Sequence, residues 1–434
     1  MAVADSITIS NLAGGPQPAL KDLYEVGEVP PLGHIPKNMY AWGLRRNRQG
    51  PPDQAMQMEV VPTWQLDSQD VLVLVMAAGV NHQGVWASLG SPVSVFDLHK
   101  SAYHIAGSDA AGVVYAVGSK VTRWKVGDEV VVHCNQDDHD DEESNGGDPM
   151  LSPSQRIWGY ETPDGALAQF ARVQSQQLLP RPRHLTWEES ACYGLKLATA
   201  YRMLFGHKPH VLEPGQNVLV WGASGGLGAF AVQLCATAGA NAIAVVSDEA
   251  KRNYVMDIGA RGVVNRKHFN CWGQLPKANS AAFNDFMKEA RRFGKAVWDI
   301  TGKGVDPDIV FEHPGEATFP VSCMVAKRGG MVVFCAGTTG TNLTFDARFV
   351  WMRQKRIQGS YLAHLKQAAA ANQLVIERRI DPGLSEVFAW NEIPKAHMTL
   401  WRNEQMLGNM AVLVSARRPG LRSFAEAAEA GMAQ

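Results

Sequence analysis

The sequence has few cysteines and no pattern that would pair them or bind a metal. The six residues are scattered, with no Cys-x-x-Cys pair, which predicts neither a disulfide framework nor a structural zinc site. The acidic segment 133–143 has metal-ligand residue types without their spacing, and we interpret it as a solvated loop rather than a metal site. We therefore expect no metal, and most cysteines are interpreted as small core residues: Cys134, Cys192, Cys235, Cys271, Cys323 and Cys335.

Long apolar runs and an excess of one charge are also missing. The longest apolar stretch, Val71–Val80, is too short to span a bilayer, and Met1–Ser6 lacks the basic start and apolar core of a secretion signal. Forty-one basic residues balance forty-two acidic ones, so nothing favours nucleic acid or an acidic membrane as partner. These features predict a cytoplasmic protein whose 434 residues suffice for two or three domains.

The most informative feature present is the glycine-rich run Asn217–Leu234, which reads as a buried strand, a turn and an apolar helix start. Gly222 allows the tight turn, Gly225 and Gly226 let a diphosphate approach the backbone, and Gly228 lets the helix lie close to the strand. The run therefore predicts a dinucleotide site.

A second strand, Asn241–Val246, and a helix that runs from Ala250 to residues 258–260 complete a βαβ unit. The unit predicts binding of NAD or NADP, against the alternative of a chance glycine turn in a parallel sheet. The turn residues expected to bind the cofactor are Gly222, Ser224, Gly225, Gly226, Leu227 and Gly228.

The end of the second strand indicates which nicotinamide cofactor is bound. Ser247 is small and polar, and Lys251 and Arg252 can pair with a 2′-phosphate, whereas Asp248 and Glu249 would repel one unless they face solvent. We therefore expect NADPH, bound through Ser247, Lys251 and Arg252.

The pattern of strands changes twice along the chain. Residues 71–178 contain short strands broken by turns, which is typical of a partly open β-barrel. Residues 213–359 alternate strands with helices, as a doubly wound parallel sheet requires, and 408–414 is one more strand. We expect an α/β protein with a barrel domain, 1–205 and 362–434, interrupted by a nucleotide domain, 206–361.

Several short motifs are distributed along nearly the whole chain. They are His104–Asp109, Gln155–Glu161, Phe311–Gly315 and Arg353–Ser360, with Asp22–Glu25 and Pro30–His34 near the start. With the interrupted barrel and the GxxGGxG turn, these motifs resemble those of crotonyl-CoA carboxylase/reductases of the medium-chain dehydrogenase/reductase superfamily. The resemblance implies a GroES-like catalytic barrel, an inserted Rossmann domain and a zinc-free site, because Ser108 stands where zinc enzymes of the superfamily carry a ligand histidine.

The resemblance implies NADPH-dependent reductive carboxylation of a 2-enoyl-CoA, crotonyl-CoA or a relative. Hydride goes to Cβ, and the enolate captures CO2 at Cα to give an alkylmalonyl-CoA. In this family CO2 is held by an asparagine, an aromatic residue, a glutamate and a histidine. Tyr160 and Glu161 match two of these, whereas Gln83 replaces the asparagine and Tyr361 replaces the histidine. A homotetramer is also implied.

Two further departures lie nearby, at His82 and Lys196. His82 is either a proton donor or a hydrogen-bonded wall residue. Lys196 either binds a carboxylate or phosphate of the ligand or faces solvent from a helix. Five basic residues either bind the phosphates of coenzyme A or are ordinary surface charges. The resemblance favours Arg348 for phosphate binding. The five residues are Arg348, Lys295, Arg353, Lys355 and Arg356.

Two other functions remain open. The departures at His82, Gln83, Lys196 and Tyr361 also fit an enoyl-CoA reductase that protonates the enolate instead of carboxylating it. The fold is also used by proteins that bind a dinucleotide without catalysis.

Overall fold

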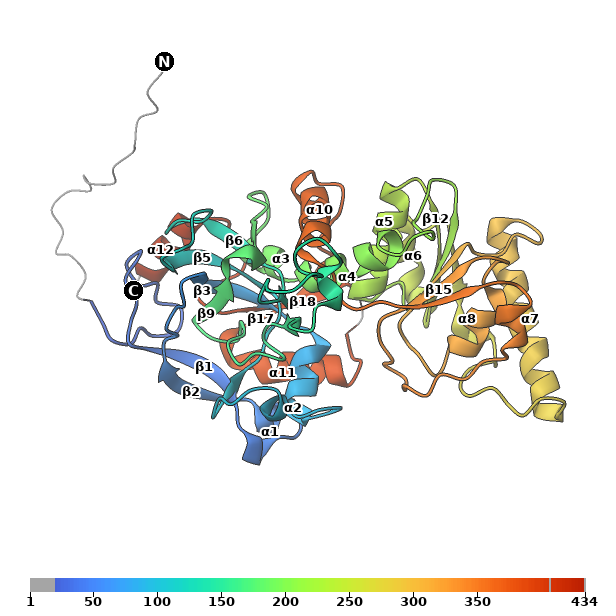
Figure 1. The fold of residues 1–434 in the computed structure, drawn as a ribbon, viewed down its shortest axis with the longest axis horizontal. Helices are drawn as coiled ribbons and strands as arrows, with labels where there is room; N and C mark the ends of the chain where they lie inside the picture. The colour runs from blue at the N-terminus through green and yellow to red at the C-terminus, as the bar shows by residue number, and fades with distance from the viewer. Residues whose placement is uncertain (1–19, 406, 433–434) are drawn as a thin grey trace, which may run out of the picture.

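The computed structural model describes residues 20–405 and 407–432, which form two lobes side by side (Figure 1). The barrel lobe carries the first and the last of the described residues, and the nucleotide lobe lies at the opposite end of the long axis. The segment Met1–Ser6, from which we predicted the lack of a secretion signal, lies outside the described residues. Within the described residues, every helix is too short or too polar to cross a bilayer.

The nucleotide lobe is built on a six-stranded parallel sheet with the order β13-β12-β11-β14-β15-β16. Its strands are β11 (Asn217–Val220), β12 (Asn241–Val246), β13 (Gly262–Asn265), β14 (Ile309–Glu312), β15 (Met331–Phe334) and β16 (Arg356–Gly359). Its helices are α5 (Gly226–Thr237), α6 (Arg252–Asp257), α7 (Ala281–Thr301), α8 (Phe319–Val325) and α9 (Arg348–Trp351).

Helices cover both faces of this sheet because successive side chains of a strand point to opposite faces. Val218 and Val220 of β11 pack in one core with Phe230 of α5. Leu219 of β11 packs on the other side with Phe293 of α7. The doubly wound parallel sheet predicted from the alternating pattern is therefore confirmed.

The barrel lobe contains a seven-stranded sheet, in which β10-β6-β5-β3-β18-β17 are neighbours and β9 pairs with β3, and a three-stranded sheet, β2-β1-β4. The strands of the larger sheet are β3 (Asp70–Gly79), β5 (Ala110–Val117), β6 (Glu129–Val132), β9 (Phe170–Gln174), β10 (Leu178–Pro180), β17 (Leu384–Phe388) and β18 (Asn409–Leu413). The others are β1 (Asn38–Leu44), β2 (Gln57–Pro62), β4 (His104–Ile105) and the pair β7 (Asn135–Gln136) and β8 (Arg156–Ile157).

The last strand of the chain lies in the barrel lobe. β18 pairs antiparallel with β3, so the segment after the nucleotide lobe rejoins the first sheet. The strand β6 begins at Glu129 because the preceding Gly127 adopts φ +94°, a left-handed turn conformation. The exact domain boundaries at 205/206 and 361/362 remain predictions.

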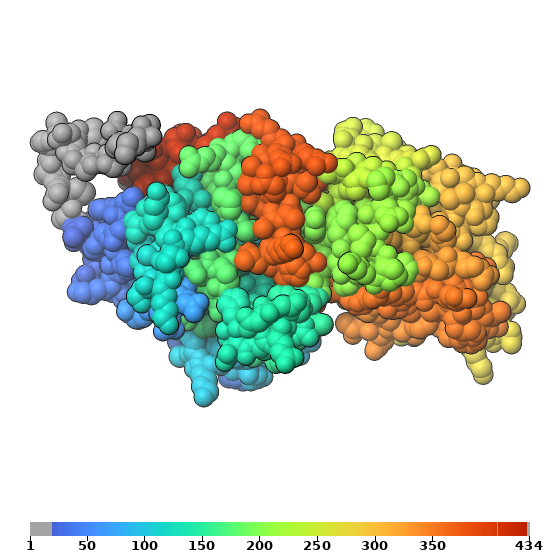
Figure 2. Space-filling model, turned by 45° about the horizontal axis from the view of Figure 1, so that its top comes forward, coloured from blue at the N-terminus to red at the C-terminus, as the bar shows by residue number. Residues whose placement is uncertain are grey.

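The helix α4 (Gly194–Phe205) joins the lobes. Its residues Leu197, Met203 and Leu204 lie in the core of the nucleotide lobe, together with Ala371 and Val375 of α10 (Leu365–Ile376). In the space-filling view α10, in orange, lies against the green α5 region at the junction (Figure 2). The remaining helices belong to the barrel lobe: α1 (Pro52–Ala55), α2 (His82–Leu89), α3 (Trp187–Ala191), α11 (Ile393–Trp401) and α12 (Phe424–Met432).

Replacing Gly228 by alanine tests the close packing of α5 on β11. A Cβ at Gly228 would lie 2.4 Å from the Gly222 carbonyl oxygen and 2.8 Å from Ala223 Cα, both rigid backbone atoms. We expect Gly228→Ala to lower the free energy of unfolding by about 1–3 kcal/mol, as overpacking does, measured by urea denaturation.

The matched control is Gly294→Ala in α7, where the nearest atom, Val325 Cγ1, would lie at 3.9 Å. Alanine favours the helix there, so we expect unchanged or increased stability. Equal stability of the two variants would contradict the packing argument.

Candidate functional site

The glycine-rich turn lies between β11 and α5 and faces the junction of the lobes. Gly222 adopts φ +54°, and a Cβ there would lie 2.8 Å from the His313 ring. Gly225 is the N-cap of α5, and a Cβ there would have only an ordinary contact, 3.6 Å to the Gly222 carbonyl oxygen. Protein packing therefore does not require glycine at 225, and the open space above the helix N-terminus suits an approaching phosphate. The turn fits a dinucleotide.

Position 226 requires glycine for a structural reason that the sequence did not reveal. A Cβ at Gly226 would lie 2.1 Å from Asn409 Oδ1 and 2.8 Å from Lys196 Cδ. Gly408 also donates from its backbone N–H to the Ser224 carbonyl oxygen at 2.9 Å. Gly226 is thus needed because side chains from β18 and α4 press against the turn, in addition to any approach by a ligand.

A basic group lies at the end of β12, where the predicted 2′-phosphate site begins. Burial lowers the pKa of Lys251, Asp248 opposes this effect, and the charges of Lys267 and Arg266 lower the pKa further. Lys251 therefore lies close to two cations that follow β13. Sequence reasoning missed Arg266 and Lys267, although the carboxyl ends of neighbouring parallel strands meet at one edge of the sheet.

The two acidic residues at this edge have partners of their own. Lys267 Nζ lies 3.4 Å from Asp248 Oδ2, and Arg252 forms an ion pair with Glu249. Asp248 also accepts a hydrogen bond from the Ala250 N–H at 3.1 Å. These contacts reduce the repulsion that a 2′-phosphate would meet, and they leave Lys251 and Arg266 better placed than Arg252 to bind one.

Three of the four residues predicted to hold CO2 lie together. Burial and the charge of Glu161 raise the pKa of Tyr160. Partial burial, then Glu161, Cys134 and Tyr160, raise the pKa of Tyr361, although its side chain remains 46% exposed. Glu161 accepts a hydrogen bond from the Ile157 N–H at 2.7 Å. Both tyrosine hydroxyls are therefore protonated at neutral pH and can donate hydrogen bonds.

The fourth predicted residue, Gln83, lies in the first turn of α2 beside His82. The His82 ring packs on Trp86 at 5.9 Å between centroids, and Trp86 meets Tyr160 edge-on at 6.5 Å. Burial, followed by the charges of Lys196, His313 and His397, lowers the pKa of His82 to about 4. His82 is thus neutral at neutral pH, which favours its interpretation as a wall residue.

The predicted coenzyme A contacts lie in different places. Arg348 forms a bidentate pair with Asp346 on the exposed N-terminus of α9. Lys295 is exposed on α7, away from the junction of the lobes (Figure 1). Lys355 Nζ is buried and donates to the carbonyl oxygens of Cys323 and Met324 at the end of α8. The structure therefore does not bring these three cations to one site.

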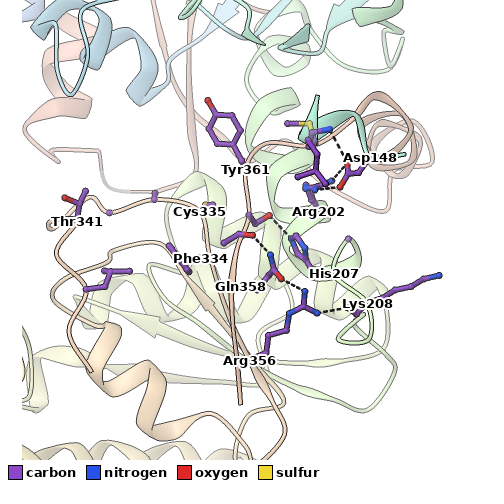
Figure 3. Close-up of a pocket in the computed structure, with 18 residues that line it drawn as sticks. Asp148, Arg202, His207, Lys208, Phe334, Cys335, Thr341, Arg356, Gln358 and Tyr361 are labelled. Carbon is purple, nitrogen blue, oxygen red and sulfur yellow. Dashed lines mark hydrogen bonds and ion pairs between the residues drawn. The ribbon is translucent and has the colours of Figure 1, made fainter. Parts of the chain in front are cut away.

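A cavity of about 690 Å³ lies where β15 and β16 end against the barrel lobe (Figure 3). Tyr361 extends from the end of β16 into this region, with its hydroxyl directed away from Gln358 and His207. The cavity wall combines apolar residues such as Phe334 and Leu343 with cationic ones. The cationic residues are Arg202, Lys208 and Arg356.

Hydrogen bonds hold this wall in place. Arg202 donates both terminal nitrogens to Asp148, at 3.1 and 2.6 Å. Arg356 Nη1 donates to the Lys208 carbonyl oxygen at 2.5 Å. Arg356 and Lys208 form no ion pair with a carboxylate of the described residues. The wall therefore carries net positive charge that suits an anionic ligand.

Behind the glycine-rich turn, Glu312 at the end of β14 is fully buried. It accepts hydrogen bonds from the Gly315 N–H at 3.0 Å, from Thr318 Oγ1 at 2.8 Å and from Ser322 Oγ at 2.5 Å. The next residue, His313, bonds through Nε2 to the Trp221 carbonyl oxygen at 2.9 Å. Burial raises the pKa of Glu312 to about 7 despite these donors.

In the part of the chain that the structure describes, no three His, Cys, Asp or Glu side chains are grouped to hold a metal ion.

Family models match both lobes of the chain. The alcohol dehydrogenase GroES-like domain matches residues 67–183, and the zinc-binding dehydrogenase model matches residues 226–377. A barrel lobe joined to a doubly wound nucleotide lobe with a glycine-rich turn defines a medium-chain dehydrogenase/reductase.

Individual relatives narrow this class. The chain is 72% identical to crotonyl-CoA carboxylase/reductase of Cereibacter sphaeroides over 411 residues, 95% of this chain and 96% of the relative. The structure of crotonyl-CoA carboxylase/reductase AntE in complex with NADP matches with TM-score 0.88 and 45% identity, over 92% of this chain and all of that chain. The 2-octenoyl-CoA carboxylase reductase CinF in complex with NADP and 2-octenoyl-CoA matches with TM-score 0.84 and 35% identity, over 92% and 93%.

The chain therefore belongs to the crotonyl-CoA carboxylase/reductase family, and it is an oxidoreductase. The family and the α/β fold predicted from the sequence are confirmed. The roles of individual site residues remain predictions.

Variants at the end of β12 test the 2′-phosphate site. We expect Lys251→Met and Arg266→Met each to raise the Kd for NADPH about tenfold, because each removes a charge-assisted contact with the phosphate. Binding of NADH, which lacks the 2′-phosphate, should change less than twofold. Isothermal titration calorimetry measures both, with Arg252→Met as the control in which the loss for NADPH is smaller. Equal losses for the two cofactors would contradict this site.

Replacing Glu312 by glutamine tests the buried carboxyl. The folded pKa of about 7 lies above the unfolded value, so the folded state holds the proton more tightly. This contribution to stability is complete below about pH 4.3 and is lost as pH rises towards 7, by about 1.4 kcal/mol per pH unit. The free energy of unfolding of Glu312→Gln, minus that of wild type, should therefore rise over this interval and level off above pH 7.

Urea denaturation at several pH values measures this difference. The stability of the wild-type protein as a function of pH does not isolate Glu312, because buried histidines contribute the opposite trend. Burial lowers the pKa of His104 to about 3, so its contribution to the stability of the protein is lost as pH falls. A difference that does not vary with pH would contradict a raised pKa at Glu312.

Proposed function

We propose that this protein catalyses the NADPH-dependent reductive carboxylation of a 2-enoyl-CoA, crotonyl-CoA or a relative, to an alkylmalonyl-CoA. The observation that carries the proposal is the meeting of Tyr160, Glu161 and Tyr361 at the junction of the lobes, where Tyr361 lines the 690 Å³ cavity. Membership of the family, whose AntE structure contains NADP, supports it. Bound NADPH supplies the hydride that goes to Cβ.

The chain's own residues must hold CO2 beside Cα and limit proton delivery to the same carbon. The Glu161 carboxylate is fixed by the Ile157 N–H, and its charge raises the pKa of Tyr160 and of Tyr361. The hydroxyls of Tyr160 and Tyr361 and the Gln83 amide are the donors available for a CO2 oxygen. The raised pKa of Tyr361 keeps its proton on the oxygen, so this hydroxyl donates a hydrogen bond without readily giving up the proton.

The cavity also suits the coenzyme A part of the substrate. Lys208 and Arg356 on its wall are cations without a carboxylate partner among the described residues. We propose that they attract the substrate phosphates, with Arg348 and Lys295 as the weaker candidates of the original set. The relative CinF, whose structure contains 2-octenoyl-CoA, supports an enoyl-CoA as the ligand class.

Non-carboxylating reduction is the second candidate, and the observation that favours it is the exposure of Tyr361. Its side chain is 46% exposed, so water can reach the region where CO2 must be held. Protonation of the enolate would then give a saturated acyl-CoA. The third alternative from the sequence, a dinucleotide-binding protein without catalysis, does not fit a chain that is an oxidoreductase.

A homotetramer and a cytoplasmic location complete the proposal. The homotetramer rests on the family resemblance, and the location rests on the lack of a long apolar run in the sequence. Light scattering coupled to gel filtration measures the first. A mass near four times 47.3 kDa is the expected result.

Product analysis decides between carboxylation and reduction. The purified protein is incubated with NADPH, crotonyl-CoA, labelled bicarbonate and carbonic anhydrase, and the thioesters are identified by mass spectrometry. We expect labelled ethylmalonyl-CoA. Butyryl-CoA alone would place the protein among non-carboxylating reductases, and no NADPH oxidation with any enoyl-CoA would overturn the proposal.

Variants then test the two replaced residues. Tyr361→Phe removes one hydrogen-bond donor, so we expect the ratio of carboxylated to reduced product to fall about tenfold while NADPH oxidation continues. Gln83→Asn combined with Tyr361→His restores the residues typical of the family and should raise that ratio above the Tyr361→Phe value.

The matched control is Tyr103→Phe, because that ring packs on Trp64 and Arg45 rather than at the cavity. It should leave the product ratio unchanged. An unchanged ratio in Tyr361→Phe would remove Tyr361 from the site that holds CO2.

A further inference from the structure

Lys196 crosses from the barrel side of α4 to the glycine-rich turn. Its Nζ donates to the Val80 carbonyl oxygen at 3.1 Å and to Asn409 Oδ1 at 3.0 Å. An ammonium group has three protons, so these two bonds leave one for a ligand. The side chain is not the solvent-facing lysine that the sequence left open as an alternative.

The position of the ammonium is fixed by two contacts with the turn. Lys196 Cδ and Asn409 Oδ1 are the atoms that a Cβ on Gly226 would strike. Gly408, next to Asn409, is bonded to Ser224 and forms a bridge with Gly225. The lysine therefore lies against the first residue of α5, where the helix presents unpaired backbone N–H groups.

The charge at this place has no direct counter-ion among the described residues. The neighbouring carboxyl, Asp109, is already bonded to the Asn81 Nδ2 and to the Leu195 N–H, at 2.9 and 2.6 Å. It forms no ion pair with Lys196 within the described ranges. Burial lowers the pKa of Lys196, and Asp109 only partly offsets this.

The local electrostatics thus favour an anion. A cation beside the positive end of α5 is unfavourable until a negative group lies between them. His82 cannot supply further positive charge, because its pKa of about 4 leaves it neutral at neutral pH. Lys196 is therefore a side-chain cation that packs directly on this turn.

We propose that Lys196 binds the cofactor diphosphate at the phosphate nearer the nicotinamide. The barrel lobe carries Tyr160 and Glu161, so the nicotinamide must point towards it and its phosphate must pass Lys196. Lys251 and Arg266 would hold the adenosine end. Lys196 is thus a cofactor-binding residue rather than a substrate-binding one. This inference rests on the proposed use of NADPH.

Binding of cofactor fragments tests the assignment without enoyl-CoA. Reduced nicotinamide mononucleotide contains the phosphate assigned to Lys196, and 2′,5′-ADP contains only adenosine phosphates. We expect Lys196→Met to raise the Kd for NADPH and for reduced nicotinamide mononucleotide about tenfold. The Kd for 2′,5′-ADP should change less than twofold.

Lys251→Met is the matched control with the opposite expectation: weaker binding of NADPH and 2′,5′-ADP, and unchanged binding of reduced nicotinamide mononucleotide. Lys196→Gln keeps donors for Val80 and Asn409 without the charge, and it replaces Lys196→Met if circular dichroism shows that variant unfolded. It should show the same losses as Lys196→Met.

Two results would overturn the inference. One is unchanged binding of NADPH and of reduced nicotinamide mononucleotide by a folded Lys196 variant. The other is a higher KM for enoyl-CoA with unchanged NADPH affinity, which would assign Lys196 to the substrate. Failure of the wild-type protein to bind NADPH would instead overturn the proposed function.

Discussion

The site depends on the way α4 is held between the lobes. The buried carboxyl of Asp109, in the barrel lobe, accepts the Leu195 N–H at 2.6 Å and so caps the N-terminus of α4. Further along the same helix, Leu197, Met203 and Leu204 are buried in the core of the nucleotide lobe. One helix therefore carries a polar contact with one lobe and an apolar contact with the other. Because α4 also carries Lys196, the distance from the barrel to the glycine-rich turn is set by this helix.

The same constraint explains why glycines gather at the junction. Gly79 and Gly194 both face Asp109, where a Cβ would lie 2.8 and 2.9 Å from its side chain. Gly226 faces Lys196 and Asn409 in the same way. A methyl group at Gly79 or Gly194 would clash with Asp109, and a methyl group at Gly226 would force the glycine-rich turn away from β18 and α4.

The sequence predicted the fold well because the fold follows from local patterns. The strand Asn241–Val246 is observed with the predicted bounds, since a continuous apolar run is buried on both faces of a parallel sheet. The site was less predictable because its geometry joins distant segments. Arg266 follows a different strand from Lys251, and only the sheet order brings them together. The partner of Arg348, Asp346, is two residues away, yet spacing alone did not reveal that it already holds the guanidinium.

The four departures from the family pattern share one physical property: none of them adds a strong acid near the substrate. His82 is neutral because burial and nearby cations lower its pKa to about 4. The pKa of Tyr361 is raised by burial and by Glu161, and an amide such as Gln83 does not ionise. Lys196, the one remaining cation, is directed to Val80, Asn409 and the glycine-rich turn.

Groups of this kind donate hydrogen bonds but hold their protons, because proton transfer to an enolate is favoured by a donor of low pKa. CO2 needs only a weak donor, whereas protonation of the enolate needs an acid. The changes at these positions are therefore compatible with carboxylation, since the chemistry depends on the pKa of each donor more than on the identity of the side chain. Water is a proton source that the pKa values of these side chains do not control. Access of water past Tyr361 therefore decides between the carboxylated product and the reduced product.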